Sequence, residues 1–215
     1  MKKVMLIGDS IRAGYDKYVK MALEDSAEVY YPEENCRFAQ YVLRGLGDWR
    51  NASKFGDETD CLHWNAGLWD CLILYGEDKL TPLDEYEGFI ERICKRIQLL
   101  FPKAKVIFAT STPVQEDRYD PATFQRYNRD IEAYNAAAVK IVTKYGFAVN
   151  DLYTLLKDAP DSYHSDMTHY YTRKATEVIT GQVLQHIQEA IGVEAKEIDY
   201  RQFFQETEEE DIVGI

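Results

Sequence analysis

Residues 3–10 read Lys3-Val4-Met5-Leu6-Ile7-Gly8-Asp9-Ser10, an apolar run that stops at a glycine and opens into a polar turn. A short apolar run bounded by a turn residue is typical of a buried β-strand. The spacing of apolar residues over 12–24 then predicts a helix. The stretch therefore predicts a strand, a turn and a helix, the unit from which α/β folds are built.

The same alternation continues along the chain. The expected strands are Lys3–Ile7, Ala27–Tyr31, Asp60–Asn65, Lys105–Thr110 and Ala148–Val149, and the expected helices are Arg12–Glu24, Phe38–Gly45, Leu83–Leu100, Ala122–Tyr145 and Tyr171–Ile191. Strands that alternate with helices predict a three-layer α/β/α sandwich with a parallel sheet of about five strands. We expect one domain over residues 1–195, followed by an acidic tail over 196–215.

Composition narrows the class of protein. Hydrophobic residues make up 46% of the 215 residues, which is enough for a real core. Lys and Arg number 25 against 37 Asp and Glu, so the net charge is −12. Such a charge argues against a nucleic-acid partner and against binding to anionic lipid. We therefore expect neither nucleic acid nor a membrane as partner, and the sequence leaves the oligomeric state open.

Two features predict a cytoplasmic location. The four apolar residues after the first lysines are too few for a signal peptide, and no run is long enough to span a membrane. The cysteines are few for this length and form no CxxC pair, which favours reduced thiols. They are Cys36, Cys61, Cys71 and Cys94.

The first candidate for chemistry is Ser10. Reactive groups of parallel sheets lie at the carboxyl ends of the strands, and Ser10 follows the first expected strand. Its hydroxyl can face the mouth of the sheet, where the N–H groups of the starting helix can bind an oxyanion. The alternative is structural, because Asp9 and Ser10 are both residue types favoured as helix N-caps.

The second candidate is Asp166-Met167-Thr168-His169, which precedes the last expected helix. A nucleophilic serine needs a base, and the base needs an orienting carboxylate. A tight turn can bring Asp166 onto one ring nitrogen of His169 and leave the other for Ser10. Two alternatives stay open: a polar loop that caps the helix, and a metal site formed by His164, Asp166 and His169.

The third candidate follows the third expected strand, in His63-Trp64-Asn65-Ala66-Gly67-Leu68-Trp69-Asp70. The amide of Asn65 can donate to an oxyanion. Trp64 and Trp69 can line a pocket for a sugar or an acyl group, or they can belong to the core.

Four blocks together resemble the SGNH hydrolases, also called GDSL esterases. They are Gly8-Asp9-Ser10, Ile107 to Val114, Tyr134-Asn135 through Tyr153, and Asp166-x-x-His169, in that order over residues 3 to 190. The resemblance implies a flavodoxin-like SGNH hydrolase fold and ester hydrolysis without a cofactor or metal. It implies Ser10 as the nucleophile, His169 as the base and Asp166 as the residue that orients it.

Two blocks depart from the family pattern. Trp69 stands where the family has an asparagine, so we assign that donor role to Asn65. The loop after the second strand lacks the glycine whose N–H the family uses, and we assign the N–H of Cys36 instead. The expected oxyanion hole therefore consists of the Ser10 N–H, the Cys36 N–H and Asn65.

The expected substrate is a small-molecule ester with a short acyl group, such as an acetyl group on a carbohydrate, bound beside Trp64 and Trp69. Two other functions remain open. One is a non-catalytic carbohydrate- or ligand-binding module, because a fold does not fix a function. The other is a Mg²⁺-dependent phosphatase with Asp9 as the nucleophile and Asp70 and Asp151 as carboxylates for the metal.

Overall fold

The computed structural model describes residues 1–204, and residues 205–215 fall outside that range. Its central sheet has five parallel strands, in the spatial order β2 (Ala27–Tyr30), β1 (Lys2–Ile7), β3 (Cys61–Trp64), β5 (Lys105–Ala109) and β7 (Ala148–Asn150). The chain moves from β1 outward to one edge, then returns past β1 to build the other side. This reversal creates a crevice at the carboxyl ends of β1 and β3, where ligands of open α/β sheets bind.

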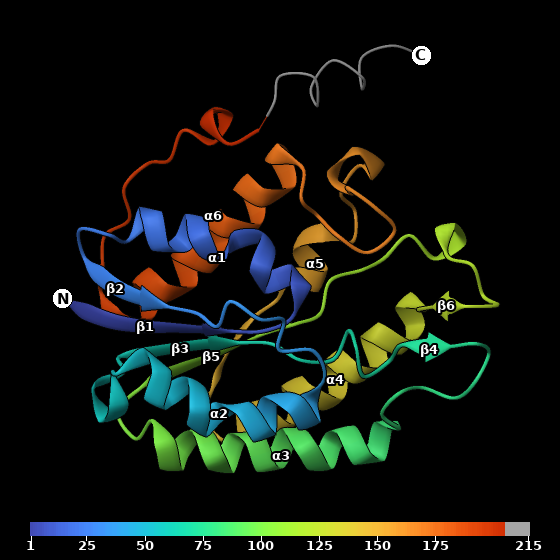
Figure 1. The fold of residues 1–215 in the computed structure, drawn as a ribbon, viewed down its shortest axis with the longest axis horizontal. Helices are drawn as coiled ribbons and strands as arrows, with labels where there is room; N and C mark the ends of the chain where they lie inside the picture. Colours follow the sequence, from blue (N-terminus) through green and yellow to red (C-terminus); the bar gives the residue numbers. More distant parts are fainter. Residues whose placement is uncertain (205–215) are drawn as a thin grey trace.

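Helices cover both faces of the sheet. Figure 1 shows α1 (Ser10–Ala22) and α6 (Arg173–Ile191) on one face, and α2 (Ala39–Ser53), α3 (Leu83–Leu100) and α4 (Asn128–Lys144) on the other. Because both faces are covered, a central strand has no solvent side, and Val4 through Ile7 are fully buried. The predicted three-layer α/β/α fold is confirmed.

Helix α2 corrects one sequence expectation. We expected it to end at Gly45 and Gly47, but it continues to Ser53. Glycine in a helix interior costs only about 1 kcal/mol relative to alanine, so tertiary packing can override it. Gly45 has such a role, because a Cβ there would lie 2.4 Å from the indole of Trp49, one turn further along. The absence of a side chain at Gly45 therefore makes room for the Trp49 indole on the same helix.

Several short elements were not expected. Strands β4 (Ile73–Leu74) and β6 (Phe124–Gln125) pair antiparallel outside the main sheet. Residues assigned to the start of a long helix at Ala122 form β6 instead, so α4 begins at Asn128. The remaining elements are α5 (Leu152–Leu156) and the 3₁₀ turns η1 (Gly56–Glu58), η2 (Glu116–Arg118), η3 (Asp161–Tyr163) and η4 (Tyr200–Gln202).

The first residues of the predicted tail lie against the domain. The Lys196 N–H donates to the Ala22 carbonyl at 2.8 Å, and the ring of Tyr200 lies 5.2 Å from that of Tyr18 on α1. The acidic run over 206–211 is outside the described residues. The boundary at residue 195 therefore stays a prediction.

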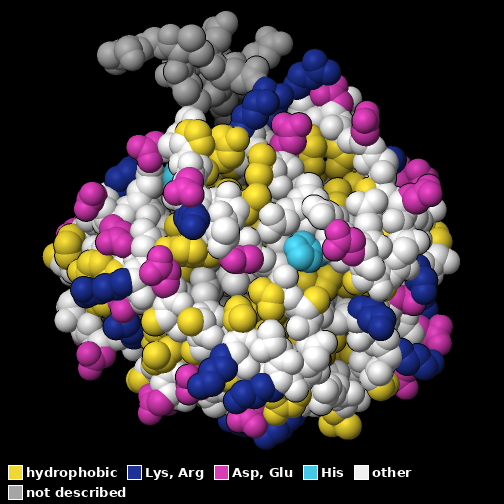
Figure 2. Space-filling model, turned by 180° about the vertical axis from the view of Figure 1, so that it is seen from behind, with side chains coloured by type: hydrophobic (Ala, Val, Ile, Leu, Met, Phe, Trp, Pro, Cys, Tyr) yellow, Lys and Arg dark blue, Asp and Glu magenta, His cyan; other side chains and the backbone are white. Residues whose placement is uncertain are grey.

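Charged side chains of both signs are distributed over the surface. On the face shown in Figure 2, acidic and basic groups are interspersed rather than gathered by sign. Within residues 1–204, no helix combines the length and apolar character needed to cross a lipid bilayer.

Candidate active site

The register of β1 and β3 brings two of the predicted residues together. Ile7 pairs with Trp64, so the strands end level and Gly8 and Asn65 leave the sheet side by side. The Asn65 N–H donates to the Ile7 carbonyl at 3.0 Å. A Cβ on Gly8 would lie 1.8 Å from the Asn65 Oδ1 atom, so this close approach requires glycine.

Asp9 is the N-cap of α1, and Ser10 is the first residue of that helix. The Asp9 carboxylate accepts a hydrogen bond from the Ile11 N–H at 3.0 Å. The side chain is fully buried, and burial raises the pKa of this carboxyl. Asp9 therefore has no exposed oxygen that could attack a phosphate. The phosphatase alternative, which needs Asp9 as the nucleophile, is wrong on this point.

The Asp166–His169 segment is a tight turn built around one carboxylate. Asp166 Oδ1 accepts from the Thr168 N–H at 2.7 Å and from the His169 N–H at 2.8 Å. Asp166 Oδ2 lies 2.7 Å from His169 Nδ1. The Gln115 N–H donates to the Met167 carbonyl at 2.9 Å and ties the turn to the segment that leaves β5.

The turn aims His169 at Ser10. His169 Nε2 lies 2.8 Å from Ser10 Oγ, so an unbroken chain of hydrogen bonds runs from the serine through the imidazole to Asp166. Partial burial raises the pKa of Asp166. The hydrogen bonds from the His169 ring and from the Thr168 and His169 N–H groups together outweigh it, so the pKa lies below its usual value. Asp166 is thus held as a carboxylate against the ring.

Comparisons with known proteins point to GDSL-type esterases and lipases. No family model matches the chain. The chain is 23% identical to the GDSL esterase/lipase CPRD49 of Arabidopsis thaliana over 185 residues, which is 76% of this chain and 70% of that protein. This likeness supports the resemblance to the SGNH hydrolases that the sequence motifs indicate.

Solved structures share the SGNH hydrolase fold. A lipase/acylhydrolase from Enterococcus faecalis superposes with a TM-score of 0.70 at 19% identity, covering 92% of this chain and 100% of the other. A catalytic mutant of Axe2, an acetylxylan esterase from Geobacillus stearothermophilus, superposes with a TM-score of 0.67 at 17% identity, covering 90% and 95%.

Of the three predicted oxyanion donors, the assignment of the Cys36 N–H is wrong. Its N–H donates to the Gly8 carbonyl at 3.0 Å, because the loop after β2 stays hydrogen-bonded to the end of β1. The N–H of Arg37 is also used, by the Asn35 side chain, and that of Ala39 by Asp70. Gln40, in the first turn of α2, has no intrahelical acceptor for its N–H.

Asn65 lies beside the turn that carries Ser10, as predicted. Its side chain is buried and interacts with the Asp9 carboxylate, and its Oδ1 has no partner among residues 1–204. The amide thus presents its polar atoms next to Gly8, two residues before Ser10.

The two tryptophans predicted to bind substrate differ in their burial. Trp64 is fully buried and packs on Phe108, with ring centroids 4.9 Å apart. Its assignment to substrate binding is therefore wrong, because both faces of β3 are covered by helices. Trp69 is half-buried, and its assignment stays a prediction.

The alternative metal set is not assembled. His164 packs against Tyr170 with ring centroids 4.1 Å apart, whereas His169 is engaged by Asp166 and Ser10. Among residues 1–204, no group of three or more His, Cys, Asp or Glu side chains is arranged to hold a metal ion.

One residue at this site was missed from the sequence. The hydroxyl of Tyr171 donates to the Ser10 carbonyl at 2.6 Å. Nothing in the local pattern indicates this contact, because it joins residues at opposite ends of the chain.

Proposed function

We propose that this protein is a serine esterase that hydrolyses short acyl esters, with acetyl esters of carbohydrates as the substrate class. The observation that carries the proposal is the chain of hydrogen bonds from Ser10 Oγ through both nitrogens of His169 to Asp166, at 2.8 and 2.7 Å. This geometry lets one imidazole accept a proton from the serine while the carboxylate stabilises the charge that results.

In the proposed reaction, Ser10 Oγ attacks the acyl carbonyl carbon as His169 Nε2 takes the hydroxyl proton. The tetrahedral intermediate collapses, the C–O bond to the alcohol breaks, and His169 returns the proton to the departing oxygen. Water then attacks the acyl-serine carbonyl carbon and loses a proton to His169. The bond from the acyl carbon to Ser10 Oγ breaks, His169 returns the proton to Ser10 Oγ, and the carboxylic acid leaves.

The negative charge on the intermediate needs donors at the carboxyl ends of β1 and β3. We assign the Ser10 N–H, the Asn65 amide and the Gln40 N–H to this role. The N–H groups of Ser10 and Gln40 lie in the first turns of α1 and α2, where helix N–H groups lack intrahelical acceptors. Gln40 replaces Cys36, whose N–H is occupied.

Two observations support the substrate class. Among the similar structures are an acetyl xylan esterase, AlAXEase, and the acetylxylan esterase Axe2. A half-buried Trp69 beside the end of β3 offers an apolar surface for a sugar ring or an acyl group. All four cysteines are free, which supports the cytoplasm as the place of action.

The test is hydrolysis of p-nitrophenyl acetate by the purified protein and by Ser10→Ala. We expect turnover by the wild type and its loss in the variant, with unchanged circular dichroism. A wild type that binds acetylated oligosaccharides without releasing acetate would instead support the non-catalytic binding module. Release of acetate from acetylated xylo-oligosaccharides in preference to longer acyl esters would support the substrate class.

A further inference from the structure

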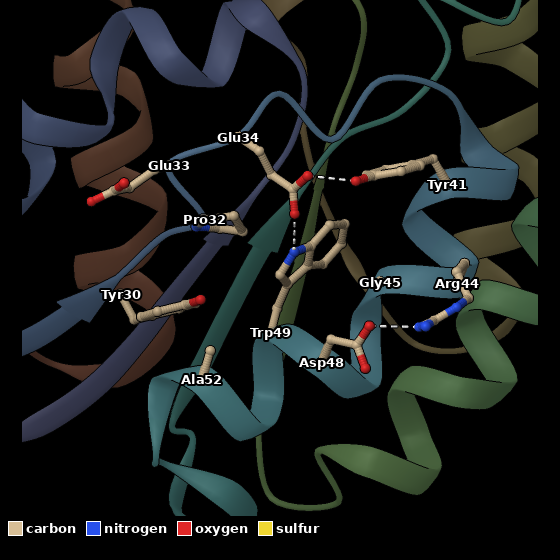
Figure 3. A pocket seen from close by; sticks show the side chains of 10 residues that line it. All are labelled: Tyr30, Pro32, Glu33, Glu34, Tyr41, Arg44, Gly45, Asp48, Trp49 and Ala52. Carbon is tan, nitrogen blue, oxygen red and sulfur yellow. Dashed lines mark hydrogen bonds and ion pairs between the residues drawn. The ribbon is translucent and has the colours of Figure 1, made fainter.

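A pocket of about 600 Å³ lies between the edge strand β2 and helix α2. Figure 3 shows its lining side chains, which come from the end of β2, from the loop that follows and from one side of α2. They are Tyr30, Pro32, Glu33, Glu34, Tyr41, Arg44, Gly45, Asp48, Trp49 and Ala52. No residue of the candidate active site lines this pocket.

Aromatic rings form much of its wall. Tyr41 and Trp49 lie with ring centroids 6.1 Å apart and planes inclined by 50°, and Tyr30 lies across from them (Figure 3). Gly45 leaves room for the indole of Trp49, because a Cβ there would lie 2.4 Å from it. The missing side chain at Gly45 therefore lets the indole of Trp49 lie against α2 at the wall of the pocket.

The pocket is also acidic. Its lining includes three carboxylates, Glu33, Glu34 and Asp48, and one basic side chain, Arg44, which pairs with Asp48 at 2.6 Å. Glu34 is anchored by the hydroxyl of Tyr41 and by the Trp49 indole N–H, the latter at 3.0 Å. These two hydrogen bonds lower the pKa of Glu34, so its charge is kept at the wall.

The loop that carries Glu34 is held in place by a buried side chain of α1. Arg12, which is fully buried, donates to the Pro32 carbonyl at 2.9 Å and to the Glu34 carbonyl at 2.6 Å. A wall fixed in this way needs little ordering when a ligand enters, which favours binding.

Aromatic faces combined with fixed negative charge suit one ligand chemistry. A methylated ammonium ion presents positive charge on apolar methyl groups, and it needs ring faces and a negative field rather than hydrogen bonds. Both carboxylate oxygens of Glu34 already accept hydrogen bonds from the rings, so the wall offers charge more than free acceptors. We propose that the pocket between β2 and α2 binds a methylated ammonium group, such as the head group of choline.

The test of this proposal measures ligand binding, so its result does not depend on whether the protein hydrolyses esters. Tetramethylammonium and choline are titrated into the full-length protein at constant ionic strength, and the Trp49 indole N–H resonance is followed by NMR. Dimethylbutanol, in which carbon replaces the nitrogen of choline, is the uncharged control. We expect saturable shifts with both cations and about tenfold weaker binding of the neutral analogue.

Two variants locate the site. Glu34→Gln removes the charge, and Trp49→Leu removes a ring, so we expect each to weaken choline binding about tenfold. Because Trp49→Leu also removes the reporter resonance, the affinities of the wild type and the variants are compared by isothermal titration calorimetry. Glu87→Gln on α3, an exposed carboxylate outside the pocket, is the matched control and should bind as the wild type does. Circular dichroism checks that each variant is folded.

The outcomes are distinct. Equal binding of choline and dimethylbutanol, unchanged affinity in a folded Glu34→Gln, or no saturable shift with either cation would each overturn the proposal. Retention on phosphatidylcholine vesicles that is lost in both variants would support it with a lipid as the source. Binding of free choline without retention on vesicles would support it with a soluble ligand.

Discussion

The ring of Tyr171 lies parallel to the imidazole of His169, with ring centroids 4.8 Å apart and planes inclined by 19°. Its hydroxyl donates to the Ser10 carbonyl at 2.6 Å. One side chain therefore contacts the residue proposed as the base and the backbone of the residue proposed as the nucleophile. Ser10 and His169 come from opposite ends of the chain, and Tyr171 bridges them.

Substitution of Tyr171 should lower kcat and leave KM nearly unchanged. Tyr171→Phe keeps the stacked ring and loses one hydrogen bond, which is worth about 1 kcal/mol, so a few-fold loss is expected. Tyr171→Leu loses both contacts, and we expect a loss of about tenfold or more because misplaced catalytic groups react slowly. Steady-state kinetics on p-nitrophenyl acetate checks this. Equal kcat in the wild type and Tyr171→Leu would remove the positioning role.

Gly14 should matter for the same reason. A Cβ at this position would lie 2.7 Å from the ring of Tyr171, so Gly14→Ala should displace the ring. We expect kcat to fall while α1 stays folded, since alanine favours helices. In the double variant with Tyr171→Leu, the second substitution should add little. Losses that multiply in the double variant would show that Gly14 acts by another route.

Asn65→Ala should reduce kcat by at least tenfold. Removal of one oxyanion donor typically costs about 10²–10³-fold, and Asn65 is the side-chain amide beside the Ser10 turn. KM and the circular dichroism spectrum should change little. A folded Asn65→Ala with normal kcat, together with a large loss in a Trp69 variant, would transfer the donor role to Trp69.

Asp70 should make stability depend on pH. Burial raises the pKa of this carboxyl to about 7, although the Ala39 N–H and the Thr81 side chain donate to it and oppose the rise. Between its ordinary value of about 4 and about 7, the folded protein binds a proton that the unfolded chain releases. The contribution of Asp70 to stability is therefore full below about pH 4 and is lost as pH rises through about 7.

The measurement is the Tm of the wild type and Asp70→Asn across that range. The variant cannot ionise, so its Tm should gain on that of the wild type as pH rises from about 5 to about 8. A constant difference between the two curves would show that Asp70 does not change its protonation there.

Local sequence predicted the parts of the site that depend on short-range geometry. Asp166 and His169 are three residues apart, and a single turn suffices to join them. The turn at Ser10 follows from an apolar strand that stops at Gly8. Both could be recognised because neither needs knowledge of a distant neighbour.

The errors have the opposite origin. The Cys36 N–H is occupied because the loop after β2 continues to pair with β1, a fact set by strand order. Gly45 lies inside α2 because Trp49 needs the space. The Tyr171 contact joins residues 161 positions apart. In each case a tertiary contact outweighs a local preference. A sequence pattern within a short window holds no information about such contacts.

The most direct test of the account compares kcat on p-nitrophenyl acetate for Ser10→Ala, His169→Ala and the double variant. Residues that act as one unit give non-additive losses, so we expect each single change to cost about 10⁴-fold or more and the pair little beyond that. EDTA should leave the wild-type rate unchanged. Multiplicative losses in the double variant, or activity that survives Ser10→Ala, would contradict the triad.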